Sequence, residues 1–339
     1  MKLLADASLP GLLQAFPKPF ELTFYHHLEE VPQLLQGQQI LVCRSTLKVN
    51  EKLLGSHSLS HVATASSGTD HIDGFYLRKH SIQLIDAKGS NASAVADYVL
   101  ATLAFLQINH GLKKTKVAVI GVGEVGKTVT RRLTAVNMEV INYDPLRCQH
   151  DASFFSNALS EVMHCDLLCL HANLHDKHPF PSQKLINAAF LAQLKPNTVL
   201  INAARGGIVD EEALLALQKP LVYCTDVFLH EPTINPKIVD FATLCTPHIA
   251  GHSIEAKYRA VATVSERLHR SFNLPLPKLN FPYVSTPFLP SQNWQEEILA
   301  FYNPSIETKL LKESSDKTKT FLQLRRAHQN RHDFCSAES

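Results

Sequence analysis

A regular alternation of short apolar runs and amphipathic stretches between residues 116 and 244 restricts the fold more than any other feature of the chain. The runs are KVAVIG, EVINYD, DLLCLH, TVLIN, LVYCTDV and ATLC, and the stretches between them include VGKTVTRRLTAV, AAFLAQLK and EEALLALQ. Short β-rich runs separated by helical stretches are typical of βαβ units, in which parallel strands are buried on both faces. We predict a Rossmann-type, doubly wound parallel sheet.

A second alternation precedes it. The runs KLLAD, ELTFY, QILVC, HVATAS and IQLIDA predict the strands of a smaller, flavodoxin-like α/β domain, and Asn91 is placed to begin a long apolar helix, ASAVADYVLATLAFLQ. The amphipathic stretch after His248 predicts one helix that returns to this first domain. We therefore expect a first domain over residues 1–92, a Rossmann-type domain over 93–247, the return segment over 248–274 and a short C-terminal region over 275–339.

The C-terminal region has fewer periodic elements. Residues 275–290 are rich in proline, which indicates an extended connection. A weak helix is predicted at residues 298–302, and the segment KTKTFLQLRRAHQNRH is basic. We interpret that segment as a solvated helix in preference to an anion-binding patch.

Composition excludes several classes of function. The formal net charge of +2 gives no overall argument for nucleic acid or an anionic membrane as partner. The seven cysteines form no CxxC pair, and several lie in apolar runs, which favours reduced, mostly buried thiols. The N-terminal apolar stretch is too short for a signal peptide, and no run reaches the about 20 apolar residues that span a bilayer. We expect a soluble, cytoplasmic protein.

The run VAVIGVGEVG combines a strand, a GxGxxG pattern and a helix start. Gly121 permits the tight turn, Gly123 lets a pyrophosphate approach the backbone, and Gly126 lets the helix pack on the strand. The amides at the start of the helix then face the phosphates. Asp144 lies 18 residues beyond Gly126, where a carboxylate accepts hydrogen bonds from a ribose and repels a 2′-phosphate. NAD is therefore favoured over NADP, although Arg147 nearby tempers that preference.

Three further residues follow inferred strands, where open α/β sheets place their ligands. Arg205 follows TVLINAA, Glu231 lies in DVFLHEP, and His248 lies in TPHIAGH. An arginine fork can hold a carboxylate and polarise a neighbouring oxygen, and a histidine can accept a hydroxyl proton near neutral pH. A carboxylate beside the imidazole fixes its tautomer. These residue types fit the oxidation of a 2-hydroxy acid, and we expect the glycines after Arg205 to let cofactor and substrate pass close to the backbone.

The blocks ARGGIVDEEAL, DVFLHEP and TPHIAG, together with the fingerprint, resemble the signature blocks of the D-isomer-specific 2-hydroxyacid dehydrogenase family over about residues 1–272. The resemblance implies that Arg205, Glu231 and His248 are the catalytic set. It also implies NAD contacts at further positions, which are Glu124, Val125, Ala172, Ala203, Ala204, Asp226 and Gly251.

The N-terminal runs LVCRSTLKVNEKLL and HVATASSGTDHID, followed by NASAVADYVL, narrow the resemblance to a branch that oxidises a phosphorylated hydroxy acid in vitamin B6 synthesis. Substrate contacts then fall on Ser45, Ser66 and His252. At the position of Ser66 the branch more often has Thr, and at the position of His252 it usually has Tyr. Arg44 and Lys48 are nearby cations for a phosphate. The branch has a C-terminal dimerisation domain, and residues 275–339 of this chain correspond to a shortened form of it. We expect a homodimer.

Other interpretations remain. Another family member, acting on 3-phosphoglycerate or on glyoxylate and hydroxypyruvate, fits the same blocks. An NAD-sensing binding protein of the corepressor type shares the fold, but the blocks around Ser45 and Ser66 favour an enzyme. His171, His175 and His178 invite a metal site, which we reject because histidines in strand-end loops lack the partners and rigid face a metal needs.

Overall fold

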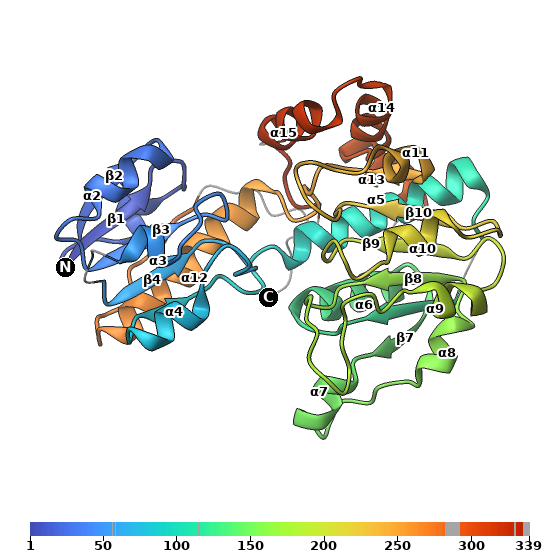
Figure 1. Cartoon of the computed structure of the whole chain (residues 1–339), viewed down its shortest axis with the longest axis horizontal. Helices are drawn as coiled ribbons and strands as arrows, with labels where there is room; N and C mark the ends of the chain where they lie inside the picture. Colours follow the sequence, from blue (N-terminus) through green and yellow to red (C-terminus); the bar gives the residue numbers. More distant parts are fainter. Residues whose placement is uncertain (56, 58, 114–115, 282–291, 329, 335–339) are drawn as a thin grey trace. The chain divides into compact units, whose positions relative to one another are not determined.

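The computed structural model describes residues 1–55, 57, 59–113, 116–281, 292–328 and 330–334. The chain divides into two compact units, which we call the first and second units. The first unit contains residues 1–91 and 253–284, and the second contains residues 92–252 and 285–339. Each unit has its own parallel sheet and its own apolar clusters (Figure 1).

The first unit is built on a five-stranded sheet in the order β2-β1-β3-β4-β5, in which every pair is parallel. This order is the flavodoxin-like one, and the predicted fold is confirmed. Its elements in chain order are β1 Lys2–Asp6, α1 Leu12–Ala15, β2 Glu21–Tyr25, the 3-10 helix η1 Leu28–Glu30, α2 Val31–Leu34, β3 Ile40–Cys43, α3 Glu51–Leu54, β4 His61–Thr64, α4 Gly74–Lys79, β5 Gln83–Ile85 and α12 Ile254–Ser271.

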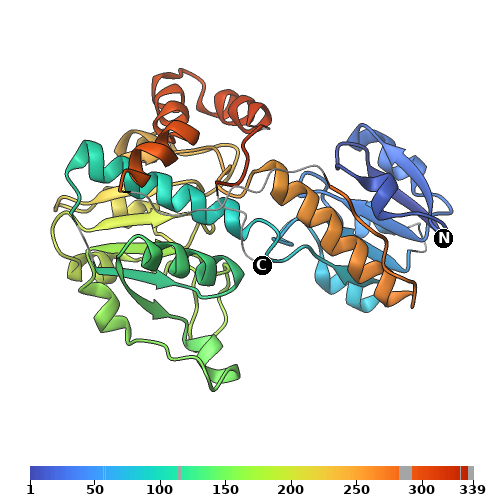
Figure 2. The same cartoon turned by 180° about the vertical axis from the view of Figure 1, so that it is seen from behind.

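Helix α12 covers one face of this sheet, although it lies far from the strands in the sequence (Figure 2). Its apolar face contributes Val261, Val264 and Leu268 to the cluster that contains Leu3 of β1 and Ile40 of β3. An amphipathic helix must bury its apolar stripe, and the sheet provides the surface that does so. The catalytic candidate His248 lies before this helix, in the second unit.

The second unit has a six-stranded parallel sheet in the order β11-β10-β9-β8-β6-β7. Five of the strands occupy the predicted runs with fully or largely buried residues, as expected for strands covered on both faces. The elements are α5 Ala92–His110, β6 Lys116–Ile120, α6 Glu124–Ala135, β7 Glu139–Tyr143, α7 Pro145–His150, α8 Leu159–Met163, β8 Leu167–Leu170, α9 Ala188–Gln193, β9 Val199–Asn202, α10 Glu211–Leu215, β10 Val222–Thr225, α11 Pro236–Phe241 and β11 Leu244–Cys245.

Helix α5 is the central helix of the second unit. By length and composition it could cross a membrane, but 72% of the apolar window is buried inside the protein. Leu100, Leu103 and Leu106 join the cluster that contains Val119 of β6 and Ile298 of α13. Its high mean hydropathy therefore reflects burial on several sides, as in a core helix.

In its described residues the C-terminal region contains three helices: α13 Trp294–Phe301, α14 Ser305–Glu313 and α15 Lys317–Ala327. They lie on the second unit (Figure 1). The weak helix predicted at residues 298–302 begins earlier, and α14 was not predicted at all. Thr308 of α14 hydrogen-bonds both the amide and the carbonyl of Cys245 in β11 (2.9 and 3.0 Å), so the region is tied to the edge strand of the sheet.

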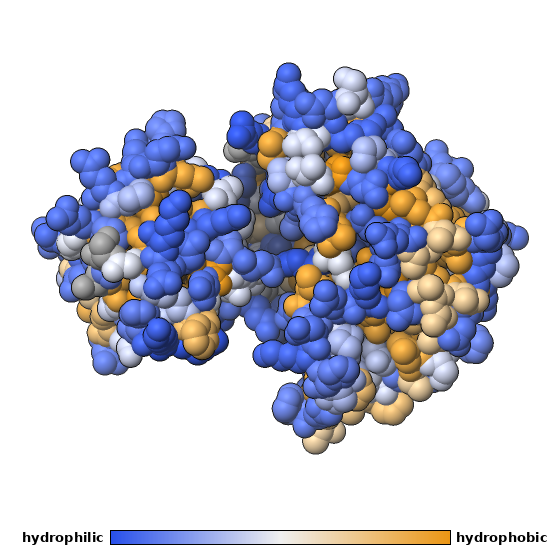
Figure 3. All heavy atoms as spheres, in the orientation of Figure 1, coloured by the Kyte–Doolittle hydropathy of each residue, from blue (hydrophilic) through white to orange (hydrophobic). Residues whose placement is uncertain are grey.

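The boundaries differ from the sequence prediction in detail. Residues 248–252 belong with the Rossmann-type unit, and residues 275–281 belong with the first unit. Residues 275–281 carry no helix or strand, and residues 282–290 of the predicted proline-rich connection lie outside the described part of the chain. On the face drawn in Figure 3, hydrophilic side chains cover most of each unit and hydrophobic ones show only in patches.

Candidate active site

The catalytic candidates Arg205, Glu231 and His248 follow three neighbouring strands of the second unit. Arg205 comes after β9, Glu231 after β10 and His248 after β11, and these strands pair side by side in parallel. Their carboxyl ends therefore lie along one edge of the sheet, which is where open α/β sheets hold ligands.

Glu231 and His248 are in direct contact. The Nδ1 atom of His248 lies 2.6 Å from Oε2 of Glu231, and Oε1 of the same carboxylate accepts a hydrogen bond from the Phe228 amide at 2.9 Å. An ionised carboxylate only accepts hydrogen bonds, so the imidazole proton belongs on Nδ1. The other nitrogen, Nε2, then has a lone pair that can take a proton. The arrangement suits a general base.

The surroundings keep this carboxylate charged. Burial by itself raises the pKa of Glu231, but the adjacent His248, the Phe228 amide and Arg325 outweigh it and hold the pKa below its usual value. The side chain of His248 is 31% exposed, which leaves part of the ring accessible to a reactant.

The loop that carries His248 is clamped by a buried acid, Asp226. Its carboxylate accepts hydrogen bonds from the amides of Ile249 and Ala250, both at 2.8 Å, and from the Thr246 hydroxyl at 2.7 Å. His248 itself has φ 56°, a left-handed conformation that costs a non-glycine residue on the order of 1 kcal/mol. The bonds to Asp226 on both sides of His248 hold the backbone in that conformation.

Arg205 lies in a turn shaped by the last residue of β9. The side-chain oxygen of Asn202 accepts from the Ala204 amide at 3.2 Å, and its amide group donates to the Arg205 carbonyl at 3.1 Å. The Arg205 guanidinium donates to the Ala204 carbonyl at 2.7 Å and is partly exposed. One guanidinium nitrogen is thus held by the backbone. A planar guanidinium held in this way can bind a carboxylate.

The expected reason for the first glycine after Arg205 needs correction. A Cβ atom at Gly206 would lie 2.0 Å from the Phe228 carbonyl oxygen, so this glycine allows two segments of the protein itself to pass closely. Only at Gly207, where φ is 86° and the nearest atoms belong to leucine side chains, is the space around the turn more open.

The residues of the fingerprint fit a dinucleotide. Gly121 has φ 86° and a Cβ there would lie 2.4 Å from the Ala172 amide, whereas a Cβ at Gly126 would lie 2.1 Å from the Gly121 carbonyl. Both glycines therefore allow close packing of the strand, turn and helix. Around Gly123 the space is open within 4 Å, and this residue is the N-cap of α6 without a side-chain cap. The first amides of α6 therefore have no side-chain partner from the N-cap and suit a phosphate.

The fingerprint lies at the point where the strand order reverses. Chain order runs from β6 to β7 on one side and then continues from β8 on the other, and Gly121 and Ala172 follow β6 and β8. A cleft of about 950 Å³ opens beside this point and is lined by Gly121, Tyr143, Asp144 and Ala172 among others. A crevice at such a switch point is the expected dinucleotide site.

Asp144 and Arg147 stand beside the glycine turn. The Asp144 carboxylate accepts from the Val122 amide at 2.8 Å and, as N-cap of α7, from the Arg147 amide at 2.9 Å. The Arg147 guanidinium meets Asp151 at 2.9 and 3.1 Å, donates to the Val122 carbonyl and stacks on a ring. Arg147, the cation near the ribose position, is therefore paired with an acid. This pairing weakens its attraction for the 2′-phosphate of NADP.

The remaining predicted cofactor contacts also lie at strand ends or at the start of α6. Glu124 and Val125 begin α6, Ala203 and Ala204 follow β9, and Gly251 belongs to the loop after β11. The Asp226 carboxylate is only 1% exposed and bonds the loop of His248, so its described role is to support that loop.

The predicted substrate residues are divided between the units. Ser45 and Ser66 follow the neighbouring strands β3 and β4, whose register pairs Cys43 with Thr64, so the two serines occupy equivalent positions at one sheet edge. Beside them the Arg44 guanidinium donates to Asp6 at 2.8 Å. His252 lies in the second unit, where burial and then the neighbouring Arg325 lower its pKa well below the usual value.

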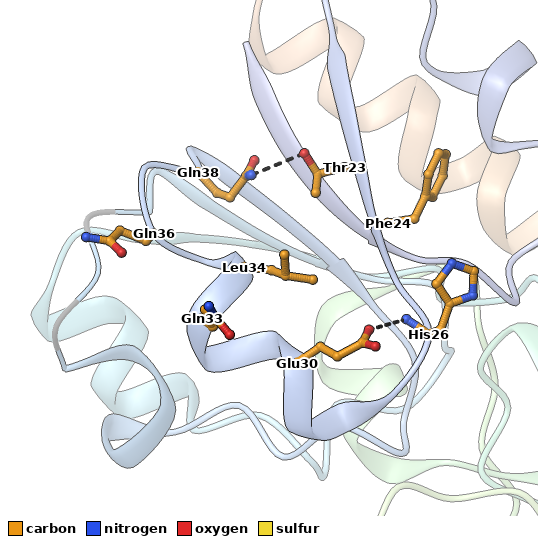
Figure 4. A pocket seen from close by; sticks show the side chains of 8 residues that line it. All are labelled: Thr23, Phe24, His26, Glu30, Gln33, Leu34, Gln36 and Gln38. Atoms are coloured by element: carbon orange, nitrogen blue, oxygen red, sulfur yellow. Dashed lines mark hydrogen bonds between the residues drawn. The ribbon is translucent and has the colours of Figure 1, made fainter.

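Two other groupings carry no catalytic argument. The described residues contain no cluster of three potential metal ligands. Burial of its ring lowers the pKa of His171 to about 3, so this imidazole is neutral. A hollow on the first unit beside β2 and α2 is lined mostly by polar side chains, together with Phe24 and Leu34 (Figure 4). There Gln38 donates to Thr23 at 3.3 Å and the carboxylate of Glu30 accepts from the His26 amide at 2.8 Å, so these groups serve local structure.

Sequence reasoning missed the roles of two residues that support the catalytic pair. Asp226 was expected only as a cofactor contact, and its bonds to the loop of His248 had no signal in the sequence. Arg325 lies in the basic segment interpreted as a solvated helix, yet its NH1 is 3.6 Å from Oε2 of Glu231. Phe321, one helical turn earlier and 1% exposed, shows that α15 has a buried face.

Known proteins with similar sequences place the chain in a family. The model of the NAD-binding domain of the D-isomer specific 2-hydroxyacid dehydrogenases matches residues 103–250. An erythronate-4-phosphate dehydrogenase of Legionella pneumophila (strain Lens) is 50% identical over 334 residues, which cover 98% of this chain and 95% of the relative. The chain belongs to the D-isomer-specific 2-hydroxyacid dehydrogenase family. An erythronate-4-phosphate dehydrogenase of Coxiella burnetii (strain RSA 331 / Henzerling II) is 34% identical, with coverage of 100% of this chain and 94% of the relative.

Solved structures agree on the fold of this dehydrogenase. The NAD⁺-bound 3-phosphoglycerate dehydrogenase of Entamoeba histolytica aligns with a TM-score of 0.68 at 21% identity, covering 83% of this chain and 99% of that one. The D-lactate dehydrogenase of Aquifex aeolicus, complexed with NAD and lactic acid, gives 0.65 at 22% identity, covering 80% and 96%. The chain is an NAD-binding oxidoreductase, as the sequence predicts.

Proposed function

We propose that this dehydrogenase oxidises 4-phospho-D-erythronate to 2-oxo-3-hydroxy-4-phosphobutanoate with NAD, as a step in the synthesis of pyridoxal 5′-phosphate. The name of the relative that is 50% identical over nearly the full chain supports the substrate. The observation that carries the chemistry is the 2.6 Å contact between Nδ1 of His248 and Glu231, because it directs the basic Nε2 of the imidazole away from the carboxylate.

Bound NAD supplies the acceptor for the hydride that leaves C2 of the hydroxy acid. Nε2 of His248 takes the proton of the C2 hydroxyl, and the C–O bond becomes a carbonyl. Glu231 stabilises the imidazolium that results and keeps its proton on Nδ1. Arg205 binds the substrate carboxylate and polarises the C2 oxygen. The proton later leaves His248 for water, which returns the pair to its starting state.

The remaining substrate groups have candidate contacts among the residues that follow β3 and β4 and at His252. The hydroxyls of Ser45 and Ser66 suit hydroxyl or phosphate oxygens, and Arg44 and Lys48 provide positive charge for the phosphate dianion. His252, with its lowered pKa, contacts the substrate as a neutral imidazole that can both donate and accept. We include Glu124, Val125, Ala172, Ala203, Ala204 and Gly251 with the fingerprint glycines and Asp144 as NAD contacts. Asp226 was expected among them, but it is 1% exposed and we assign it to the support of the His248 loop.

The proposal includes a cytoplasmic homodimer. Free cysteines fit a reducing compartment, since five of the six described thiols are buried and none of the six is in a disulfide. The C-terminal helices expose apolar side chains that a second copy of the chain could cover, and the most exposed is Ile306 at 61%.

A steady-state comparison tests the function. The full-length enzyme is given NAD with 4-phospho-D-erythronate or with 3-phosphoglycerate, and NADH formation is followed by absorbance. We expect turnover of the first substrate and at most weak turnover of the second. Turnover of 3-phosphoglycerate alone would instead favour another member of the family.

A variant tests the mechanism. His248→Asn removes the proton acceptor but preserves much of the side-chain volume, so turnover should fall by several orders of magnitude while NAD affinity stays nearly unchanged. Turnover close to that of the wild type would contradict the role of His248.

A further inference from the structure

The C-terminal helix α15 turns one face toward the catalytic residues of its own unit. Phe321 is 1% exposed and packs edge-on against Phe228, with ring centroids 6.2 Å apart. Arg325 lies four residues later and therefore on the same face of the helix. Lys319 and Arg326, in contrast, are exposed. The basic segment is thus a solvated helix only on its outer side.

Arg325 reaches the oxygen of Glu231 that bonds the catalytic histidine. Its NH1 atom is 3.6 Å from Oε2, the atom that also lies 2.6 Å from Nδ1 of His248. The Arg325 and Glu231 side chains are 29% and 19% exposed, so water screens this contact less than it screens an ion pair on the surface. With the Phe228 amide on Oε1, three separate segments of the chain hold one carboxylate.

The rest of the C-terminal region fixes α15 in this place. Thr308 of α14 bonds Cys245 in the strand that leads to His248. After α15, the guanidinium of Arg331 donates to the carbonyls of Ala94 and Ala250, and the second of these belongs to the loop of His248. The region therefore contacts the catalytic loop before and after His248, and Arg325 contacts the acid beside it.

The charge of Arg325 has a definite effect on the catalytic pair. A cation beside Glu231 favours the ionised carboxylate, and it opposes a proton on the imidazole until substrate donates one. The other charged or titratable groups that face the pair or Arg325 are Asp226, Glu211, His252, His328 and Arg331. Of these groups, His252 also has its pKa lowered, by burial and then by Arg325. A change in the pH profile is therefore assigned to the catalytic pair only together with a direct measurement on His248.

We infer that Arg325 is a positioning residue for the oxidation, one that holds Glu231 ionised and in place while His248 takes the proton. The C-terminal region then helps to position the catalytic residues and is also a candidate dimerisation region. This inference rests on the roles proposed for Glu231 and His248, and it assigns to Arg325 no contact with substrate.

The test compares Arg325→Gln with Arg326→Gln in the full-length enzyme. Both remove one positive charge from adjacent positions of α15, but Arg326 is exposed. For Arg325→Gln we expect kcat to fall by about tenfold to a hundredfold, as for other residues that orient a catalytic histidine, with the KM values for NAD and substrate within about twofold of the wild type. The acid limb of its kcat/KM profile should move to higher pH, because loss of a cation favours both protonated groups. Arg326→Gln should match the wild type.

Two more variants separate charge from packing. Arg325→Lys keeps the positive charge and should restore the acid limb, with partial recovery of kcat because the planar fork is lost. Arg325→Met keeps an unbranched aliphatic side chain but removes the positive charge. It should show the same pH shift as Arg325→Gln, and it carries the comparison if the glutamine variant does not fold.

A measurement without turnover keeps this inference separate from the proposed substrate. The imidazole NMR signal of His248, assigned by its absence from His248→Asn, should show protonation at higher pH in Arg325→Gln than in the wild type. If that signal and kcat are both unchanged, Arg325 has no positioning role. A rise of the substrate KM alone, with kcat and the acid limb unchanged, would also overturn the inference, because it would make Arg325 a substrate contact. Failure of the wild type to oxidise 4-phospho-D-erythronate would overturn the proposed substrate and leave the NMR comparison valid.

Discussion

The glycines of GVGEVG show how one residue type serves two different needs. At Gly121 and Gly126 a Cβ would come within 2.4 and 2.1 Å of backbone atoms, whereas at Gly123 it would meet nothing within 4 Å. The first two glycines are therefore required by the protein's own packing. The space around Gly123 has no such explanation from the protein, and its place at the start of α6 explains it through the phosphates of NAD.

Gly123→Ala should therefore separate folding from cofactor binding. The residue has φ −75° and alanine adopts that conformation without strain, so the thermal unfolding temperature should stay within about 2 °C of the wild type. The dissociation constant for NAD, measured by calorimetry, should rise by about tenfold or more because the methyl group occupies the approach of the pyrophosphate. Gly126→Ala is the control, and it should lower the unfolding temperature clearly. Unchanged NAD affinity in Gly123→Ala would contradict the assigned phosphate position.

Asp6 gives the first unit a stability that depends on pH. Burial opposes its charge, but hydrogen bonds from Ser8 and Arg44 outweigh burial and lower the pKa below the ordinary value of 3.8. A carboxyl group whose pKa is lowered on folding stabilises the protein fully above its unfolded pKa, and the contribution disappears as the pH falls through the folded pKa.

Asp6→Asn should therefore destabilise the first unit by about 1–3 kcal/mol at pH 7, since an amide cannot replace all the bonds of the buried acid. The difference from the wild type should remain between pH 7 and 5 and narrow below about pH 4. Urea unfolding followed at several pH values measures it. A difference that stays constant down to pH 3 would show that the charge of Asp6 is not responsible, and Ser8→Ala should give a smaller effect of the same kind.

The loop between β11 and α12 depends on one acid for its shape. Asp226 bonds three groups around His248, and His248 has the left-handed backbone that those bonds maintain. In Asp226→Asn the side-chain NH₂ group, a donor, would face at least one backbone N–H group that now donates to the carboxylate. We expect a loss of about 1–3 kcal/mol of stability and a fall in kcat of about tenfold or more, because the imidazole loses its orientation.

Hydrogen exchange checks this expectation directly, since the amides of Ile249 and Ala250 should exchange faster in Asp226→Asn than in the wild type. Tyr98→Phe is the matched control. It removes a hydroxyl that bonds Thr246, one step further from the carboxylate, and leaves the bonds of Asp226 to the loop unchanged. Wild-type exchange and kcat in Asp226→Asn would show that the loop keeps its shape without the carboxylate.

These elements mark how far the sequence could predict the structure. Strands such as KVAVIG were predictable because buried parallel strands are continuous apolar runs, and the pairing of Glu231 with His248 followed from the strand ends at which both lie. Helix α14 was not predicted because its short amphipathic pattern resembles that of a loop. Arg325 escaped for a different reason: its partner lies 94 positions earlier, and a positive charge on a helix does not reveal which face is buried.

The two units repeat one topological principle. In each sheet the second strand along the chain lies on one side of the first strand, and all later strands lie on its other side. The orders β2-β1-β3-β4-β5 and β7-β6-β8-β9-β10-β11 show this arrangement. In the first unit Arg44 and Asp6 meet across β3 and β1 at that reversal, and in the second Gly121 and Ala172 meet across β6 and β8. Candidate substrate and cofactor residues therefore occupy equivalent places, one set in each unit. The fingerprint glycines could be predicted from the sequence pattern itself, whereas the substrate residues were expected only from the family resemblance.

Assembly of two chains is the last expectation, and the exposed apolar residues of the C-terminal region are where it can be tested. Ile306 and Leu310 lie four residues apart on α14 and are 61% and 47% exposed. Such a stripe is costly in water unless a partner covers it, and an interface between identical copies that uses it twice would form a symmetric dimer. Sedimentation of the wild type at micromolar concentration should give twice the 37.7 kDa of one chain.

The double substitution Ile306→Asp and Leu310→Asp places four like charges in such an interface and should yield the 37.7 kDa monomer. Its thermal unfolding should still be cooperative, because both side chains are exposed in the single chain. Phe155→Asp is the matched control, since Phe155 is 74% exposed elsewhere in the second unit and its replacement should leave the dimer intact. A wild type that sediments as a monomer would refute the dimer, whereas a double variant that remains dimeric would place the interface on another surface.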